Sequence, residues 1–189
     1  MSDVGGVLLT GGASRRLGTD KAVLRLGGET LAARAARVLQ AVCADALEVG
    51  PGYTTLARVL EEPAGAGPLA ALVAGASASH ARCLLLLAVD LPNVEVPLLR
   101  LLRDWPGDAT VIPVASGRVQ SVCARYGPAT LERAQLARAH GESSLRAVLD
   151  GPDVELVDES VWARVAPADA FADVDVAADA ARFGLEMPR

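Results

Sequence analysis

The chain has few cysteines, few aromatic residues and no long hydrophobic run, and each shortage excludes a class of protein. Three scattered cysteines are too few for a disulfide framework or a thiolate metal site, so we expect buried thiols in a reducing compartment. The longest apolar run, residues 83–89, is far shorter than the ~20 residues that span a bilayer. Because the start, Met1-Ser2-Asp3, lacks the positive charge of a signal peptide, we expect a cytoplasmic protein with no membrane partner.

The chain also lacks a surplus of positive charge. Its net charge is −5, from 18 basic and 23 acidic residues, and no run of like charges stands out. A generic nucleic-acid binder needs a basic face, so that class is not expected, although a local cluster of donors could still hold a small anion. The length of 189 residues suits one well-cored domain over residues 1–189, and the 3% aromatic content predicts a core of Leu, Val and Ala.

Lysine is almost absent, since Lys21 is the only lysine beside 17 arginines. Isoleucine and asparagine also occur once each, as Ile112 and Asn93. This composition indicates a coding bias under which arginine readily replaces lysine. Arginine cannot imitate a compact ammonium on a slim stem where space is limited. We therefore expect Lys21 to be kept for chemistry, with chance survival on the surface as the alternative.

Apolar periodicity alternates between strand and helix over the first hundred residues. The pattern predicts strands at residues 6–9, 47–49, 58–60, 83–89, 109–114, 119–126 and 154–157. It predicts helices at residues 30–45, 68–77, 96–103, 128–139, 143–149 and 176–183. Such alternation is typical of βαβ units, so the predicted fold is a three-layer α/β/α, Rossmann-like domain with a mostly parallel central sheet.

Small or acidic residues follow four of the predicted strands. They are Gly11, Gly50, Glu62 and Asp90. In parallel α/β sheets ligands bind outside the carboxyl ends of the strands. These residues therefore predict a single site at that edge of the sheet.

The loop after the first strand, residues 9–21, reads Leu-Thr-Gly-Gly-Ala-Ser-Arg-Arg-Leu-Gly-Thr-Asp-Lys. It matches neither the dinucleotide fingerprint G-x-G-x-x-G nor a Walker A sequence. Gly11 and Gly12 let backbone amides approach an anion with no Cβ in the way.

Cations follow these glycines closely. Arg15, Arg16 and Lys21 could neutralise a triphosphate, and Ser14 adds a hydroxyl. The alternative is a tight turn with solvated arginines. Three cations so near a Gly-Gly turn favour a nucleoside-triphosphate-binding loop.

Residues 9–22 closely resemble the N-terminal signature of the molybdenum cofactor guanylyltransferases, which belong to the nucleotidyltransferase superfamily. Three further segments are similar to motifs of that family. Residues 65–72 resemble its Gly-Pro-Leu-Ala-Gly helix start, residues 89–92 its Cys-Asp-Met-Pro turn, and residues 141–149 its Gly-x-x-Ser-Leu helix. The Gly-Gly start and the Asp before Lys21 favour this branch over the related cytidylyltransferases.

The resemblance implies a set of nucleotide-binding positions. They are Leu9, Thr10, Gly11, Gly12, Ser14, Arg15, Lys21, Gly50, Glu62 and Asp90. Gly50 stands where the family usually has Asn, so it could contact base or ribose through its backbone only. Glu62 stands where the family usually has Asp, and a carboxylate there would accept hydrogen bonds from guanine N1 and N2 and select against adenine.

The resemblance also implies catalytic residues and a metal. Lys21 and Arg16 would stabilise the phosphates and the leaving pyrophosphate, and Asp90 would bind Mg²⁺, a hard cation suited to carboxylate oxygens. Taken alone, an Asp after a buried strand is as often a helix cap as a ligand. His80 and His140 lie in no triad-like arrangement, and we expect both at the surface.

The chain departs from the family pattern on the acceptor side. The family's Asn-x-Asn is Asp173-Val174-Asp175 here, and residues 119–121 lack the usual proline or histidine. Coding bias is one explanation for the first change, and altered handling of a pterin phosphate or metal is the other. Nucleotide use is therefore predicted more firmly than the acceptor.

The implied reaction is transfer of GMP from Mg-GTP to the phosphate of molybdopterin or the molybdenum cofactor. Acceptor molybdoenzymes or their chaperones would be further partners. One alternative is another acceptor or nucleotide: a sugar phosphate, phospholactate, or cytidylyl transfer to molybdopterin. The other is a non-catalytic GTP-binding protein that handles the cofactor.

Overall fold

The computed structural model describes residues 3–11 and 19–186. The predictions for Gly12, Ser14, Arg15 and Arg16 fall on residues outside this part of the chain. Within the described ranges no helix has both the length and the apolar character to cross a membrane.

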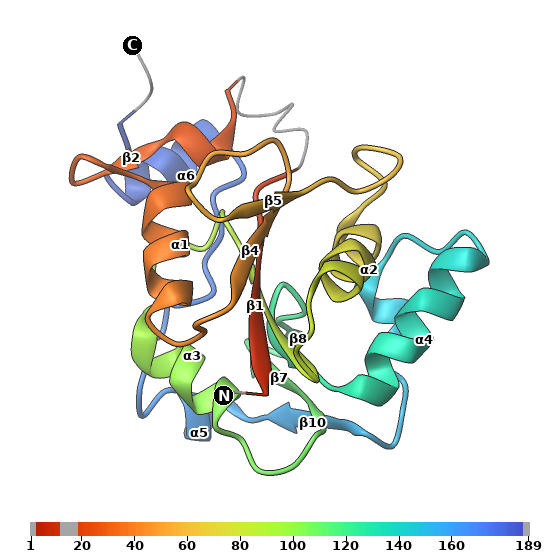
Figure 1. The fold of residues 1–189 in the computed structure, drawn as a ribbon. Helices are drawn as coiled ribbons and strands as arrows, with labels where there is room; N and C mark the ends of the chain where they lie inside the picture. Colours follow the sequence, from red (N-terminus) through yellow and green to blue (C-terminus); the bar gives the residue numbers. More distant parts are fainter. Residues whose placement is uncertain (1–2, 12–18, 187–189) are drawn as a thin grey trace.

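A mixed, mostly parallel sheet forms the centre of the molecule, as predicted (Figure 1). Its strand order is β10-β7-β9-β6-β1-β4-β5, and β8 pairs with β7. The strands are β1 (Val4–Leu9), β4 (Ala46–Val49), β5 (Ala57–Val59), β6 (Cys83–Ala88), β7 (Thr110–Ala115), β8 (Arg118–Val119), β9 (Cys123–Tyr126) and β10 (Val154–Val157). β1 is parallel to both β4 and β6, whereas β9 is antiparallel to both β6 and β7.

Helices cover both faces of this sheet, which confirms the three-layer prediction (Figure 1). On one face lie α1 (Leu31–Gln40), α3 (Val96–Arg103) and α5 (Glu159–Trp162). On the other lie α2 (Pro68–Ala78), α4 (Pro128–Ala139) and the 3₁₀ helix η2 (Leu145–Val148). Alternate side chains of β6 point to opposite faces of the sheet. Leu85 and Leu87 pack in the core on the α1 face, and Leu84 and Leu86 pack in the core on the α2 face.

The local sequence explains how the two helices nearest the site begin and pack. Thr30 caps α1 by accepting a hydrogen bond from the Ala33 amide at 3.1 Å. Pro68 starts α2, where its missing N–H costs nothing. A Cβ at Gly75 would lie 2.9 Å from the Val7 side chain, so this glycine lets α2 pack closely on β1.

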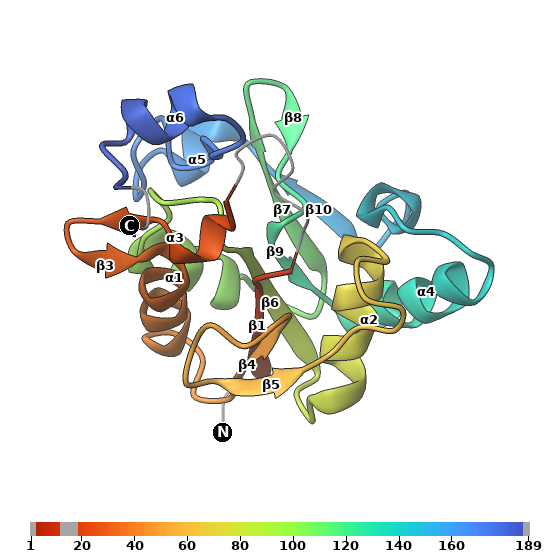
Figure 2. The same ribbon diagram turned by 90° about the horizontal axis from the view of Figure 1, so that it is seen from above.

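A third, smaller core joins the C-terminal segment to the chain after the loop. It contains residues of the 3₁₀ helix η1 (Lys21–Val23) and packs beside the hairpin of β2 (Arg25–Leu26) and β3 (Glu29–Thr30). The segment contains α6 (Ala177–Arg182), and beyond it Glu186 forms a β-bridge with Arg25 of β2; Figure 2 shows α6 and the β2–β3 hairpin on the same side of the molecule. The C-terminal segment thereby lies beside the chain that follows Lys21.

Three predicted elements differ from the structure. Residues 119–126 are not one strand, because a turn at residues 120–122, closed by a hydrogen bond from the Cys123 amide to the Gln120 carbonyl, separates β8 from β9. Residues 143–149 form the short 3₁₀ helix η2, capped by Ser144, in place of an α-helix. The helix predicted over residues 30–45 ends at Gln40.

The predictions for cysteine and histidine are confirmed. Cys43, Cys83 and Cys123 are free and buried. His80 and His140 are both exposed.

Candidate active site

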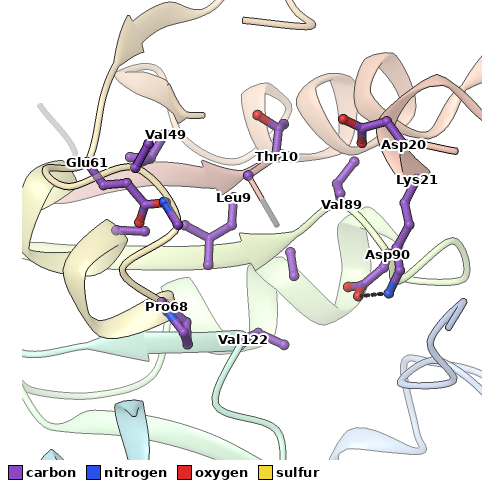
Figure 3. A pocket seen from close by; sticks show the side chains of 16 residues that line it. Leu9, Thr10, Asp20, Lys21, Val49, Glu61, Pro68, Val89, Asp90 and Val122 are labelled. Carbon is purple, nitrogen blue, oxygen red and sulfur yellow. Dashed lines mark hydrogen bonds and ion pairs between the residues drawn. The ribbon is translucent and has the colours of Figure 1, made fainter. Parts of the chain in front are cut away.

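A cavity of about 560 Å³ opens at the carboxyl ends of β1, β4 and β6 (Figure 3). Its lining residues come from the strand ends, the 61–68 turn, the start of α2, the start of η1 and the turn before β9: Leu9, Thr10, Gly11, Asp20, Lys21, Val49, Glu61, Ala64, Gly65, Gly67, Pro68, Ala71, Ala88, Val89, Asp90 and Val122. This is the edge of the sheet at which the sequence predicted a site.

Lys21 and Asp90 meet at one end of this cavity (Figure 3). The Lys21 Nζ lies 3.0 Å from Asp90 Oδ2 and 2.6 Å from Asp175 Oδ1. The Lys21 side chain is only 15% exposed. Although burial opposes a charged lysine, the carboxylates of Asp90 and Asp175 raise the pKa of Lys21 above its usual value, so the ammonium form is secured.

The C-terminal segment supplies Asp175, the second carboxylate beside Lys21. The Val174 amide donates to the Asp90 carbonyl at 3.1 Å, which fixes the segment beside β6. Burial and the neighbouring Asp175 carboxylate raise the pKa of Asp173. Among residues 3–11 and 19–186 no group of three or more His, Cys, Asp and Glu side chains is arranged to hold a metal by itself. Asp90 presents a carboxylate to the cavity and Asp175 adds one beside Lys21, so other ligands would have to come from a substrate or water.

The end of β1 forms the floor of the cavity. The Thr10 amide donates to the Val49 carbonyl at 3.1 Å, which continues the β1–β4 pairing to the cavity edge. The Thr10 side chain is buried and donates to Glu48, so its hydroxyl is already used inside the protein. Leu9 and Gly11 line the cavity, and their contact with a nucleotide stays a prediction.

Gly50 lies behind this floor and does not line the cavity. Its φ is 150°, and a Cβ there would lie 2.3 Å from Thr10 Oγ1 and 2.8 Å from the Gly11 nitrogen. The lack of a side chain at Gly50 lets the β4 end approach Thr10 and Gly11. Its predicted backbone contact to the base or ribose stays a prediction.

Glu61, and not Glu62, lines the cavity at the end opposite Lys21 (Figure 3). Glu61 Oε1 accepts a hydrogen bond from the Gly65 amide at 2.9 Å. The Glu62 side chain is exposed, and the Glu62 carbonyl accepts from Arg138 at 3.2 Å. Glu61 therefore places a carboxylate at this end of the cavity, one residue before the predicted Glu62, and contact of Glu62 with the base stays a prediction.

Asp20, which served in the sequence only as part of the family signature, is a second carboxylate that lines the cavity. Its carboxylate caps η1 by accepting from the Ala22 amide at 3.1 Å, and it also accepts a hydrogen bond from the Tyr53 hydroxyl. Since η1 begins at Lys21, these contacts fix the backbone from which the Lys21 side chain extends.

Glu48 was also missed, although a charged residue inside the apolar strand Ala46–Val49 was a visible signal. It is fully buried beneath Thr10.

The start of α2 is braced by the 141–149 segment. The Leu69 amide donates to the Ser143 carbonyl at 3.2 Å, and a Cβ at Gly67 would lie 2.9 Å from that same oxygen. Gly67 has φ 98°, which favours glycine. The four segments whose sequences resemble guanylyltransferase motifs thus converge: three supply cavity residues, and the fourth supports one of them.

Comparisons with known proteins agree with this geometry. A family model described as MobA-like NTP transferase domain matches residues 6–161. An Opitutus terrae protein named "Probable molybdenum cofactor guanylyltransferase" is 37% identical over 156 residues, which cover 77% of this chain and 77% of the relative.

Solved structures share the fold. Molybdopterin-guanine dinucleotide biosynthesis protein A from Archaeoglobus fulgidus has a TM-score of 0.77 at 18% identity, covering 94% of this chain and 95% of that one. A Mycobacterium tuberculosis protein crystallised in complex with manganese has a TM-score of 0.67 at 17% identity, with coverages of 95% and 97%. From the sequence matches and this fold together, the chain belongs to the MobA-like NTP transferase family and is a nucleotidyltransferase.

Proposed function

We propose that this nucleotidyltransferase moves GMP from Mg-GTP to the terminal phosphate of molybdopterin or the molybdenum cofactor. The phosphate oxygen attacks the α-phosphorus of GTP, the bond from the α-phosphorus to the bridging oxygen breaks, and pyrophosphate leaves. The observation that carries the proposal is the Lys21–Asp90 pair at the end of a cavity built from the family's motifs.

The residues at this end suit a reaction that needs no general base. A phosphate nucleophile is already ionised at neutral pH, so catalysis reduces to positioning and neutralising charge. The Lys21 ammonium, held in its charged form, would bind phosphate oxygens as they approach. Arg16, which lies outside the described residues, is proposed to assist on the pyrophosphate side, and Gly12, Ser14 and Arg15 to contact the phosphates.

Asp90 is the proposed metal ligand, and Asp175 is placed to assist it. Both offer carboxylate oxygens, which suit a hard divalent cation that takes one or two protein carboxylates and completes its shell with phosphate oxygens and water. The manganese complex of the Mycobacterium tuberculosis relative supports a divalent ion in this fold, and we propose Mg²⁺ here. Such an ion, when bound, supplies positive charge to the phosphates.

Glu61 is the proposed reader of the base. It lies at the cavity end opposite Lys21, where a base would rest if the phosphates lie beside the ammonium (Figure 3). Its Oε1 is engaged by the Gly65 amide, and a carboxylate can accept further hydrogen bonds from guanine N1 and N2. Glu61 thereby takes the role that the sequence predicted for Glu62.

The proposed partners are GTP, molybdopterin or its metal-loaded form, and the molybdoenzymes or chaperones that receive the product. A reducing compartment, the cytoplasm, and one domain over residues 1–189 are part of the same proposal. The three buried free thiols support the compartment.

Acceptor-dependent release of pyrophosphate tests the proposal. The purified protein would be incubated with Mg-GTP and, in parallel, with molybdopterin, a sugar 1-phosphate or phospholactate. We expect pyrophosphate only with molybdopterin or its metal-loaded form. Release with another acceptor would favour a different transferase, and GTP binding without turnover on any of them would favour a cofactor-handling protein.

A further inference from the structure

Glu48 is a fully buried carboxylate in β4, directly behind the cavity floor. Its Oε1 accepts from the Thr10 hydroxyl at 2.5 Å, the Gly52 amide at 3.0 Å and the Tyr53 amide at 2.8 Å. Its Oε2 accepts from the amide and the hydroxyl of Thr54 at 2.9 and 2.7 Å. Both oxygens are therefore surrounded by donors that belong to the β1 end and the 52–54 turn.

These contacts keep Glu48 ionised. Burial opposes ionisation, but the hydrogen bonds from Thr10, Thr54 and Tyr53 outweigh it and lower the pKa of Glu48. A buried carboxylate is costly unless every oxygen is well satisfied. The five donors satisfy this one without a salt bridge to Lys or Arg among the described residues.

The Glu48 carboxylate is connected to the chain on both sides of the glycine-rich loop, residues 11–19: directly at Thr10, and through Tyr53 at Asp20. On one side it binds Thr10, which precedes the cavity residue Gly11. On the other side it binds the backbone of Tyr53, whose hydroxyl donates to Asp20, the residue that caps η1 directly before Lys21. Thr10 and Asp20 are ten positions apart in the sequence, and Glu48 ties both to one turn.

We propose that Glu48 is a positioning residue for nucleotide binding. Its carboxylate fixes the Gly11 backbone and the Lys21 ammonium at the separation that a triphosphate needs. The inference rests on the proposed function, since it concerns binding of a nucleoside triphosphate in this cavity.

Glutamine is the sharpest substitution, because it keeps the size of Glu48 and changes only its hydrogen bonding. An amide has one acceptor oxygen and one NH₂ donor. Whichever way the amide is oriented in Glu48→Gln, its NH₂ faces at least one backbone N–H that it cannot accept, at Thr54 or at Gly52 and Tyr53. The turn should then move away from the β1 end.

Two further variants separate positioning from general stability. Tyr53→Phe removes only the hydroxyl that reaches Asp20 and keeps the amide contact to Glu48. Thr110→Val is the matched control: it removes a buried hydroxyl that donates to Thr130 and accepts from the Gly127 amide, far from the lining of the cavity.

The experiment measures KM for Mg-GTP, kcat and the dissociation constant of Mg-GTP, with folding checked by circular dichroism. We expect Glu48→Gln to raise KM and the dissociation constant about tenfold, with a smaller effect on kcat, since it removes charge-assisted hydrogen bonds. Tyr53→Phe should raise both by a smaller factor, and the double variant should bind no worse than Glu48→Gln. Thr110→Val should lower the melting temperature and leave KM unchanged.

Affinity within twofold of the wild type in a folded Glu48→Gln protein would overturn the inference, as would an equal rise in KM for Thr110→Val. If Glu48→Gln does not fold, unchanged affinity of Tyr53→Phe would overturn it. Amide hydrogen exchange at residues 19–22 and 52–54 provides a readout that needs no nucleotide. A wild-type protein that binds no Mg-GTP refutes the proposed function, and unchanged exchange in both variants refutes the positioning role separately.

Discussion

The ammonium of Lys21 lies 3.0 Å from the carboxylate of Asp90, although 69 positions separate the two residues in the sequence. Lys21 follows the glycines of the loop after β1, and Asp90 lies two residues beyond the end of the apolar strand β6. Asp175, from the C-terminal segment, contacts the same ammonium at 2.6 Å. Three distant parts of the chain therefore meet at one end of the cavity, where the chemistry of phosphate transfer would take place.

Removing either member of the Lys21–Asp90 pair should abolish most transfer. We expect Lys21→Ala and Asp90→Asn each to lower kcat/KM for Mg-GTP by a factor of about 100 or more. Lys21→Ala removes a cation that neutralises the phosphates, and Asp90→Asn weakens the proposed metal ligand. Steady-state pyrophosphate release measures the effect. Arg82→Ala is the control, since it breaks the exposed ion pair with Asp108 far from the cavity. Wild-type activity in either pair variant would refute the assignment.

The neighbours Glu61 and Glu62 offer a matched test of base recognition. We expect Glu61→Gln to reduce the preference for GTP over ATP by about tenfold, since a charged acceptor for guanine N1 and N2 is lost. Glu62→Gln should leave the preference unchanged, because its side chain is exposed outside the cavity lining. Competitive binding of the two nucleotides provides the measurement. The opposite order of effects would return the role to Glu62, and stronger binding of CTP by the wild type would refute guanine selection.

Stability should depend on pH through Glu48. Its pKa is lower in the folded protein than the usual value of 4.5, so the folded state favours the carboxylate. This contribution is complete above about pH 4.5 and is lost as pH falls through the folded pKa. Melting temperatures of the wild type and Glu48→Gln should therefore differ most near neutral pH and converge under acid conditions. A difference that stays constant from pH 7 to pH 3 would contradict the role of the ionised carboxylate.

The thiols should be inert in the folded protein. Burial raises the pKa of Cys43 to about 11 and that of Cys123 to about 12, and it also raises the pKa of Cys83. A thiol reagent at pH 8 needs an accessible thiolate, so we expect negligible labelling of the native protein and labelling of all three cysteines in denaturant. Rapid stoichiometric labelling without denaturant would show that these sites open readily.

The sequence predicted the parts of the fold that depend on local pattern. Continuous apolar runs indicated the strands β1 and β6, and the helices predicted from residues 30 and 68 correspond to α1 and α2. The only lysine and the Asp at the end of β6 indicated the two residues that meet in the cavity.

The parts that were missed depend on contacts between distant segments. The turn at residues 120–122 interrupts a run that looks like one strand, and it is fixed by hydrogen bonds that include the Pro113 carbonyl. Glu48 resembles any charged residue in a short strand until the 52–54 turn is folded over it. Which of Glu61 and Glu62 lines the cavity depends on the conformation of the 61–68 turn, which the local composition does not reveal.

Transfer of label from GTP tests the central claim most directly. The protein would be incubated with Mg²⁺, molybdopterin and GTP labelled on either the α- or the γ-phosphate. If GMP is transferred, α-label appears in a molybdopterin dinucleotide, γ-label appears only in pyrophosphate, and Lys21→Ala gives neither product. The absence of α-label from any molybdopterin product, or the appearance of γ-label as free phosphate, would contradict guanylyl transfer.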